Sequence, residues 1–97
     1  MGSSLSYAAA DAERFMGTFF ESARDGNVEA LVELGRQFSS GAGGVSVDLI
    51  EAHKWFNLAA AKGCGHAQRA RADIATEMDA SEIAKAQRAA RAFLYRV

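Results

Sequence analysis

Three side chains suited to metal binding or nucleophilic chemistry are His53, Cys64 and His66, the only histidines and cysteine in the chain. A structural zinc site normally takes four ligands in paired spacings, which these three residues do not supply. A thiol nucleophile at Cys64 would need an orienting group and an oxyanion hole. Cys64 and His66 are two residues apart at the start of a helix, so their side chains point in different directions. We therefore predict no catalytic residue, no metal site and no cofactor.

Two other patterns could bind anions. The glycine-rich run from Ser39 to Ser46 has the backbone freedom of a phosphate loop, but it lacks both the following Lys-Ser/Thr pair and a preceding strand. Basic residues also recur near the end of the chain, at Lys85, Arg88, Arg91 and Arg96. We interpret them as the solvated outer face of a terminal helix, and we expect no nucleic-acid partner.

The composition indicates one small helical domain. The chain has 97 residues, no proline and a net charge of -1, and alanine makes up much of its 49% hydrophobic content. Such a sequence favours helix and creates no field that would recruit nucleic acid or an anionic membrane. It has no apolar run long enough to cross a bilayer and no cysteine pair, so we expect a cytoplasmic protein with no membrane partner.

Apolar residues recur at spacings of three and four, which predicts five amphipathic helices. Glycines at 26, 41 and 63 separate the first four helices, and capping-box patterns begin two of them, at Asp48 with Glu51 and at Asp79 with Glu82. We predict helices over about 8–25, 28–40, 49–62, 65–77 and 80–96, preceded by a flexible terminus over residues 1–7. The prediction is an all-α fold with no sheet.

The chain contains an internal repeat. The pattern Gly-x-x-x-Ala occurs from Gly26 to Ala30 and again from Gly63 to Ala67, an offset of 37 residues. Repeats of this length, each a helix pair, are typical of stacked helical hairpins. We therefore divide residues 8–97 into one full repeat at about 28–64, a preceding part, and a capping hairpin at about 65–97.

The segment from Ala30 to Ala67 resembles the Sel-one-like repeat, a relative of the tetratricopeptide repeat. The matching residues are Leu34, Gly35, Phe38, Gly41, Gly43, Val45, Asp48, Ala52, Trp55, Ala59, Ala60, Gly63 and Ala67. The resemblance implies antiparallel hairpins in a short right-handed superhelix, with Gly35 at a close helix contact and Trp55 and Phe38 filling the hairpin. The loop is one residue longer than the family's usual form.

The resemblance also implies where a partner would bind, since the first helix of each hairpin lines a groove in tetratricopeptide-like stacks. The expected groove-facing positions are Glu29, Val32, Arg36, His66, Arg69 and Asp73, together with Ser39 and Thr76. The function implied is an adaptor or scaffold, not an enzyme, that holds a peptide segment of another protein.

Two alternatives to the adaptor remain open. Residues 1–61 are more acidic than basic and residues 62–97 the reverse, which motivates a self-associating homo-oligomer with a structural or regulatory role. A hydrolase is the second alternative, because some members of the broader repeat family have been assigned that activity.

Overall fold

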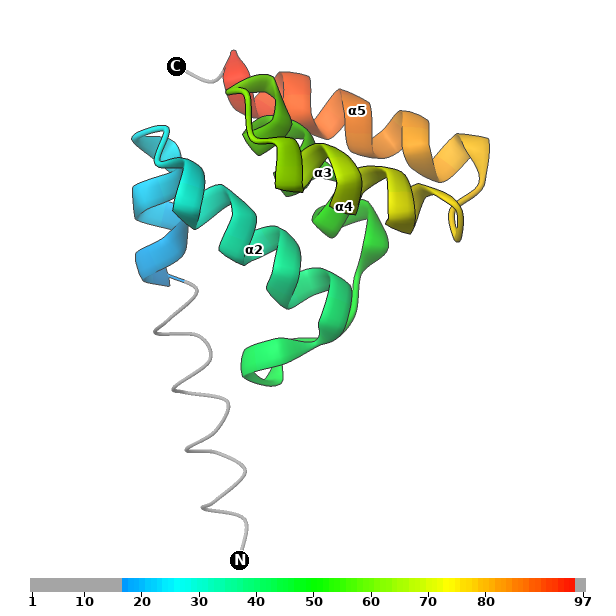
Figure 1. Ribbon diagram of the computed structural model, residues 1–97, viewed down its shortest axis with the longest axis horizontal. Coiled ribbons are helices and arrows are strands. Elements are labelled where there is room, and N and C mark those ends of the chain that lie inside the picture. The colour runs from blue at the N-terminus through cyan, green and yellow to red at the C-terminus, as the bar shows by residue number, and fades with distance from the viewer. Residues whose placement is uncertain (1–16, 96–97) are drawn as a thin grey trace, which may run out of the picture.

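The computed structural model describes residues 17–95, and within this range all regular structure is helical (Figure 1). Residues 17–24 form the end of a first helix, whose predicted start at residue 8 lies outside the described residues. The elements that follow are α2 (Val28–Ser40), the short 3-10 helix η1 (Ala42–Gly44), α3 (Leu49–Ala61), α4 (Gly65–Ala75) and α5 (Ala80–Leu94). The predicted all-α class is confirmed, and the predicted helix ends differ from these by at most about two residues.

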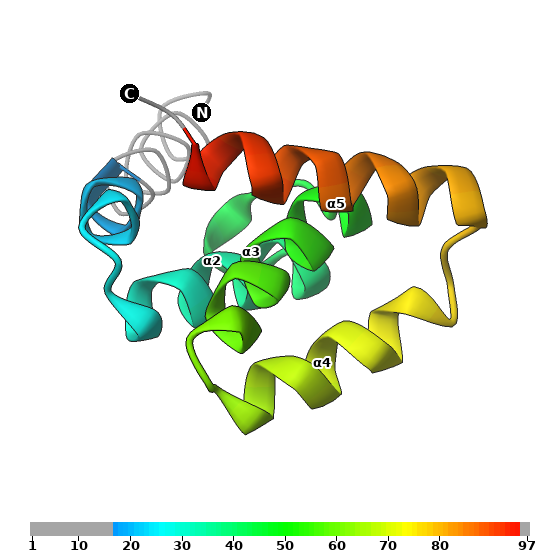
Figure 2. The same cartoon turned by 90° about the horizontal axis from the view of Figure 1, so that it is seen from above.

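Helix α3 lies at the centre of the fold, and α2, α4 and α5 all pack against it. Seen from above, α4 and α5 lie on opposite sides of α3 (Figure 2). Each of these two helices contacts α3 far more than it contacts the other. The arrangement is compatible with a short helical-repeat superhelix.

The core consists of a few large side chains among many alanines. Leu31 and Leu34 on α2 are fully buried. Seven residues of α3 are also buried: Ala52, His53, Trp55, Phe56, Leu58, Ala59 and Ala60. Alanine lets helix axes approach closely, so a core with little apolar volume still excludes water.

Trp55 joins three helices. Its ring centroid lies 5.6 Å from that of Phe20 in the first helix and 5.1 Å from that of Phe93 on α5, in an edge-to-face arrangement with Phe93. Its indole nitrogen donates a 3.0 Å hydrogen bond to Glu51. The expectation that Trp55 and Phe38 together fill the α2–α3 hairpin therefore needs refinement, because Trp55 faces the first helix and α5.

The contact between α2 and α3 is made at Gly35, as predicted. A Cβ atom on Gly35 would lie 2.7 Å from two ring carbons of Phe56, which is 3% exposed. Glycine is required here because the aromatic ring occupies the space that any side chain would take.

The 37-residue offset appears in the backbone as well as in the sequence. Gly26 and Gly63 both adopt positive φ, +81° and +94°. Each ends a helix with the same pair of turn hydrogen bonds, in which the amide of the residue after the glycine reaches back five residues, from Asn27 to Ser22 and from Cys64 to Ala59. The two turns are therefore structural equivalents.

Both predicted N-caps are present, but only one is a complete capping box. Asp79 accepts a hydrogen bond from the Glu82 amide, and the Glu82 carboxylate accepts one from the Asp79 amide. Asp48 likewise accepts from the Glu51 amide, at 3.2 Å. The Glu51 carboxylate instead contacts the Trp55 indole and, at 2.9 Å, the Lys54 amine.

Candidate functional site

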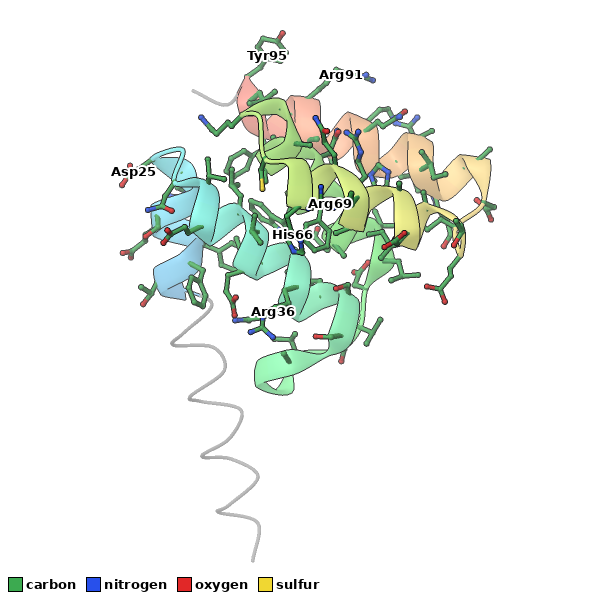
Figure 3. The ribbon with its side chains drawn as sticks, in the orientation of Figure 1. Asp25, Arg36, His66, Arg69, Arg91 and Tyr95 are labelled. Atoms are coloured by element: carbon green, nitrogen blue, oxygen red, sulfur yellow. The ribbon has the colours of Figure 1, made fainter. Side chains whose placement is uncertain are left out.

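The six predicted partner-binding residues come from two helices that both pack on α3. Helix α2 carries Glu29, Val32 and Arg36, and α4 carries the other three, His66, Arg69 and Asp73. Five of the six are exposed, and Val32 is half-buried against the core. Figure 3 shows how Arg36 projects from α2 while His66 and Arg69 come from α4. We call this set the α2–α4 face.

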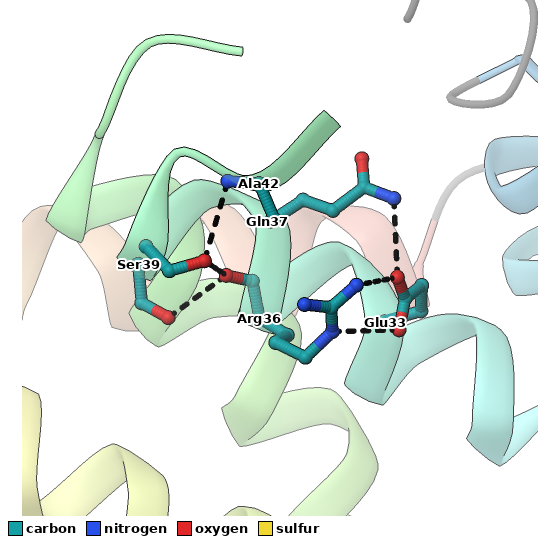
Figure 4. Close-up of polar contacts among 6 residues, drawn as sticks. Glu33, Arg36, Gln37, Ser39 and Ala42 are labelled. Atoms are coloured by element: carbon teal, nitrogen blue, oxygen red, sulfur yellow. Dashed lines mark hydrogen bonds and ion pairs between the residues drawn. The ribbon is translucent and has the colours of Figure 1, made fainter. Parts of the chain in front are cut away.

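Arg36 is not a free cation, because Glu33 holds it on the surface of α2 (Figure 4). The guanidinium donates two hydrogen bonds to the Glu33 carboxylate, one of them from Nε at 3.0 Å. Gln37 donates a third bond to the same carboxylate at 3.3 Å. The bonds from Arg36 hold the pKa of Glu33 below its ordinary value. The sequence analysis missed Glu33, although an acid three residues before an arginine on a helix is a recognisable pairing signal.

The α4 part of the face is more open. Among the described residues, the side chains of His66, Arg69 and Asp73 make no hydrogen bond or ion pair. Only Ala67 of α4 is fully buried, so most of the helix surface faces solvent. Because α4 offers one cation, Arg69, and one anion, Asp73, without described partners, it can pair with a polar segment at little cost to its own structure.

A buried polar cluster lies between α3 and α4. His53 is 4% exposed, and its Nδ1 atom is buried without a hydrogen-bond partner. Burial lowers the pKa of His53, and the nearby positive charge of Arg71 lowers it further. Arg71 donates a hydrogen bond to Asn57, one turn after His53 on α3. The contact between Arg71 and His53 was not predicted from the sequence. The available signal was an arginine 37 residues after Leu34, at the position equivalent to a buried leucine.

The histidines and the cysteine do not form a shared site. His53 is buried on α3, Cys64 is half-buried at the N-cap of α4, and His66 is exposed in the first turn of α4. In the part of the chain that the structure describes, no three histidine, cysteine or acidic side chains are placed to share a metal ion.

Two cavities lie away from most of the α2–α4 face. The larger one, of about 790 Å³, is at the end of the molecule where the first helix, α3 and α5 terminate. The smaller one, of about 310 Å³, lies between the first helix and α2, and Glu29 is the only predicted residue that lines it. The sequence analysis predicted neither cavity.

No protein-family model, curated protein or solved structure matches this chain. The resemblance to the Sel-one-like repeat therefore rests on the signature residues alone. Among residues 17–95, no helix has both the length and the apolar character needed to span a bilayer.

Proposed function

We propose that this protein is an interaction module of the Sel-one-like type that binds a polar segment of a partner protein across the α2–α4 face. The observation that supports this function is the exposure of unpaired charges of both signs on α4, together with the exposed arginine that Glu33 holds on α2. Arginine is enriched among residues that dominate binding energy at interfaces, and charged rims set partner choice and association rate.

The geometry favours a weak and specific complex. Arg36 is presented in one orientation by Glu33, so little conformational entropy is lost when it binds a carboxylate. Arg69 and Asp73 are one turn apart on α4 and bear opposite charges, so they favour a partner whose charges alternate with the reverse sign. Binding of this kind weakens as salt screens the charges.

The test compares partner capture by charge-reversed variants. Arg69→Glu is the informative change because Arg69 has no described ion pair, whereas Arg36→Glu would also place a carboxylate beside Glu33. The control is Arg88→Glu, an exposed reversal on α5 that gives the same net charge. Captured proteins are quantified by mass spectrometry from the same extract.

We expect at least one protein to be retained by the wild type and by Arg88→Glu but lost with Arg69→Glu. An identical set of captured proteins for all three would exclude the α2–α4 face as the binding surface.

A further inference from the structure

The larger cavity is lined by apolar and basic residues, and none of them belongs to the α2–α4 face. It lies where the C-terminal ends of three helices meet: residues 17–24, α3 and α5. Its apolar surface comes from Leu31, Leu58, Phe93 and the exposed side of Leu94, with alanines between them. A cavity of roughly 150 Å³ accommodates a benzene-sized group, so about 790 Å³ has room for more than one large side chain.

The polar side chains around this cavity are cationic. Arg24 and Lys62 line it, and none of the described residues in its lining is acidic. The Lys62 amine reaches across from the end of α3 to the first turn, where it lies 3.0 Å from the position that a Cβ of Gly26 would occupy. Asp25, the nearest acid in the sequence, points outward from this turn in Figure 3. An occupant would therefore meet apolar walls and positive charge at the same opening.

The exposed surface continues beyond the cavity along the end of α5. Leu94 is 56% exposed and Tyr95 is 80% exposed, and as neighbours they extend the apolar surface of the cavity. Tyr95 and Arg91 project from this end of the helix (Figure 3). An extended chain that leaves the cavity would cover these side chains, whereas a compact small molecule would not.

We propose that this cavity docks a peptide segment of a partner protein in which a large apolar side chain is flanked by carboxylates. The apolar side chain enters between Leu58 and Phe93, and a carboxylate of the segment pairs with Lys62. Burial of the apolar group supplies most of the affinity, and the positive charge of Lys62 selects acidic over basic segments. This surface is separate from the α2–α4 face, so either proposal can fail without the other.

Cations at helix C-termini also offset the partial negative charge of the helix ends, and the Lys62 amine, beside the glycine that ends the first helix, stabilises that helix in this way whether or not the cavity is filled. The two roles are separable. Loss of dipole compensation lowers stability, whereas loss of docking changes which peptide binds. The experiment therefore measures both for every variant.

The probes are two synthetic hexapeptides, Asp-Glu-Leu-Phe-Asp-Glu and its charge-reversed form Lys-Lys-Leu-Phe-Lys-Lys, titrated into nitrogen-15-labelled full-length protein. We expect the acidic peptide to shift the amide resonances of Gly26, Ala61 and Lys62, and the basic peptide to leave them unchanged. Lys62→Glu should weaken acidic-peptide binding about tenfold, and Lys62→Arg should retain it.

Ala61→Phe is a second variant that does not depend on the charge of Lys62. Ala61 is exposed and lines the cavity, so a phenyl ring there fills it with no change in charge. We expect this variant to remain folded in thermal unfolding and to lose peptide binding.

Each of the following results would overturn the proposal: equal binding of both peptides, shifts confined to other surfaces, undiminished binding by Ala61→Phe, or tighter binding of dodecanoate than of the acidic peptide. The last would assign the cavity to a lipid-like ligand. Shifts at Gly26 and Lys62 that depend on protein concentration in the absence of peptide would assign it to a second copy of this chain, and would also overturn the proposal.

Discussion

Replacing Gly35 by alanine tests whether the α2–α3 contact is as tight as the structure shows. The new Cβ would lie 2.7 Å from Cδ1 and Cε1 of Phe56, well inside the roughly 3.5–4.0 Å at which carbon atoms attract. Phe56 cannot turn away into solvent, because it is 3% exposed and surrounded by the core. Either α2 must move away from α3 or the ring must leave its preferred rotamer.

The sign of the effect follows from two opposed contributions to the free energy of unfolding. Glycine to alanine in a helix interior stabilises by about 1 kcal/mol when nothing obstructs the methyl group. Overpacking a closed core costs about 1–3 kcal/mol, and the approach of 2.7 Å to a buried ring places this substitution in the upper part of that range, about 2–3 kcal/mol. We expect net destabilisation of about 1–2 kcal/mol, which for a domain of this size lowers the melting temperature by roughly 5–15 °C.

Thermal and urea unfolding measure this change, and Gly65→Ala is the matched control. Gly65 begins α4, and a Cβ there would meet only the Arg69 guanidinium at an ordinary 3.5 Å. The control should be as stable as the wild type or slightly more stable. Truncating the ring with Phe56→Leu should make Gly35→Ala less costly than in the wild type. If Gly35→Ala matches or exceeds the wild type in stability, the close contact is refuted.

Two further predictions concern the cap of α5 and the buried histidine. Asp79→Ala should cost about 1 kcal/mol because it removes the capping box, Asp79→Ser should retain most of the stability, and equal melting temperatures would contradict the cap's role. The pKa of His53 is lowered in the folded state, first by burial and then by the charge of Arg71. As the pH falls below 6.5, the unfolded chain therefore binds the proton first, and the free energy of unfolding decreases. Urea unfolding between about pH 7.5 and pH 5, above the range where carboxylates titrate, should show this loss in the wild type and not in His53→Phe; equal slopes would exclude His53 as the cause.

The helices were predictable because their signals are local. Glycine at positive φ ends a helix wherever it occurs, and an aspartate before an apolar run caps the helix that follows, so Gly26, Gly63 and Asp79 fixed their elements without tertiary information. The close contact at Gly35 was expected from the resemblance to the Sel-one-like repeat, and a glycine on the apolar face of a helix agrees with it.

The features that were missed depend on how helices lie relative to one another. Spacing placed Trp55 on an inner face but could not show that its neighbours would be Phe20 and Phe93. The approach of Arg71 to His53 requires the packing of α4 on α3, and the large cavity exists only because three helix ends converge. None of these is encoded in the periodicity of a single segment.

The central position of α3 determines how cooperatively the protein unfolds. In a long repeat array each unit packs only against its neighbours, so an end of the array can unfold while the rest stays folded. Here α2, α4 and α5 all pack on α3, and the first helix contacts α3 through Phe20 and Trp55. Loss of α3 would leave the other helices without a common surface, and a helix of 11–15 residues is marginal in water on its own. The chain should therefore unfold in a single step and yield no shorter fragment that keeps its shape.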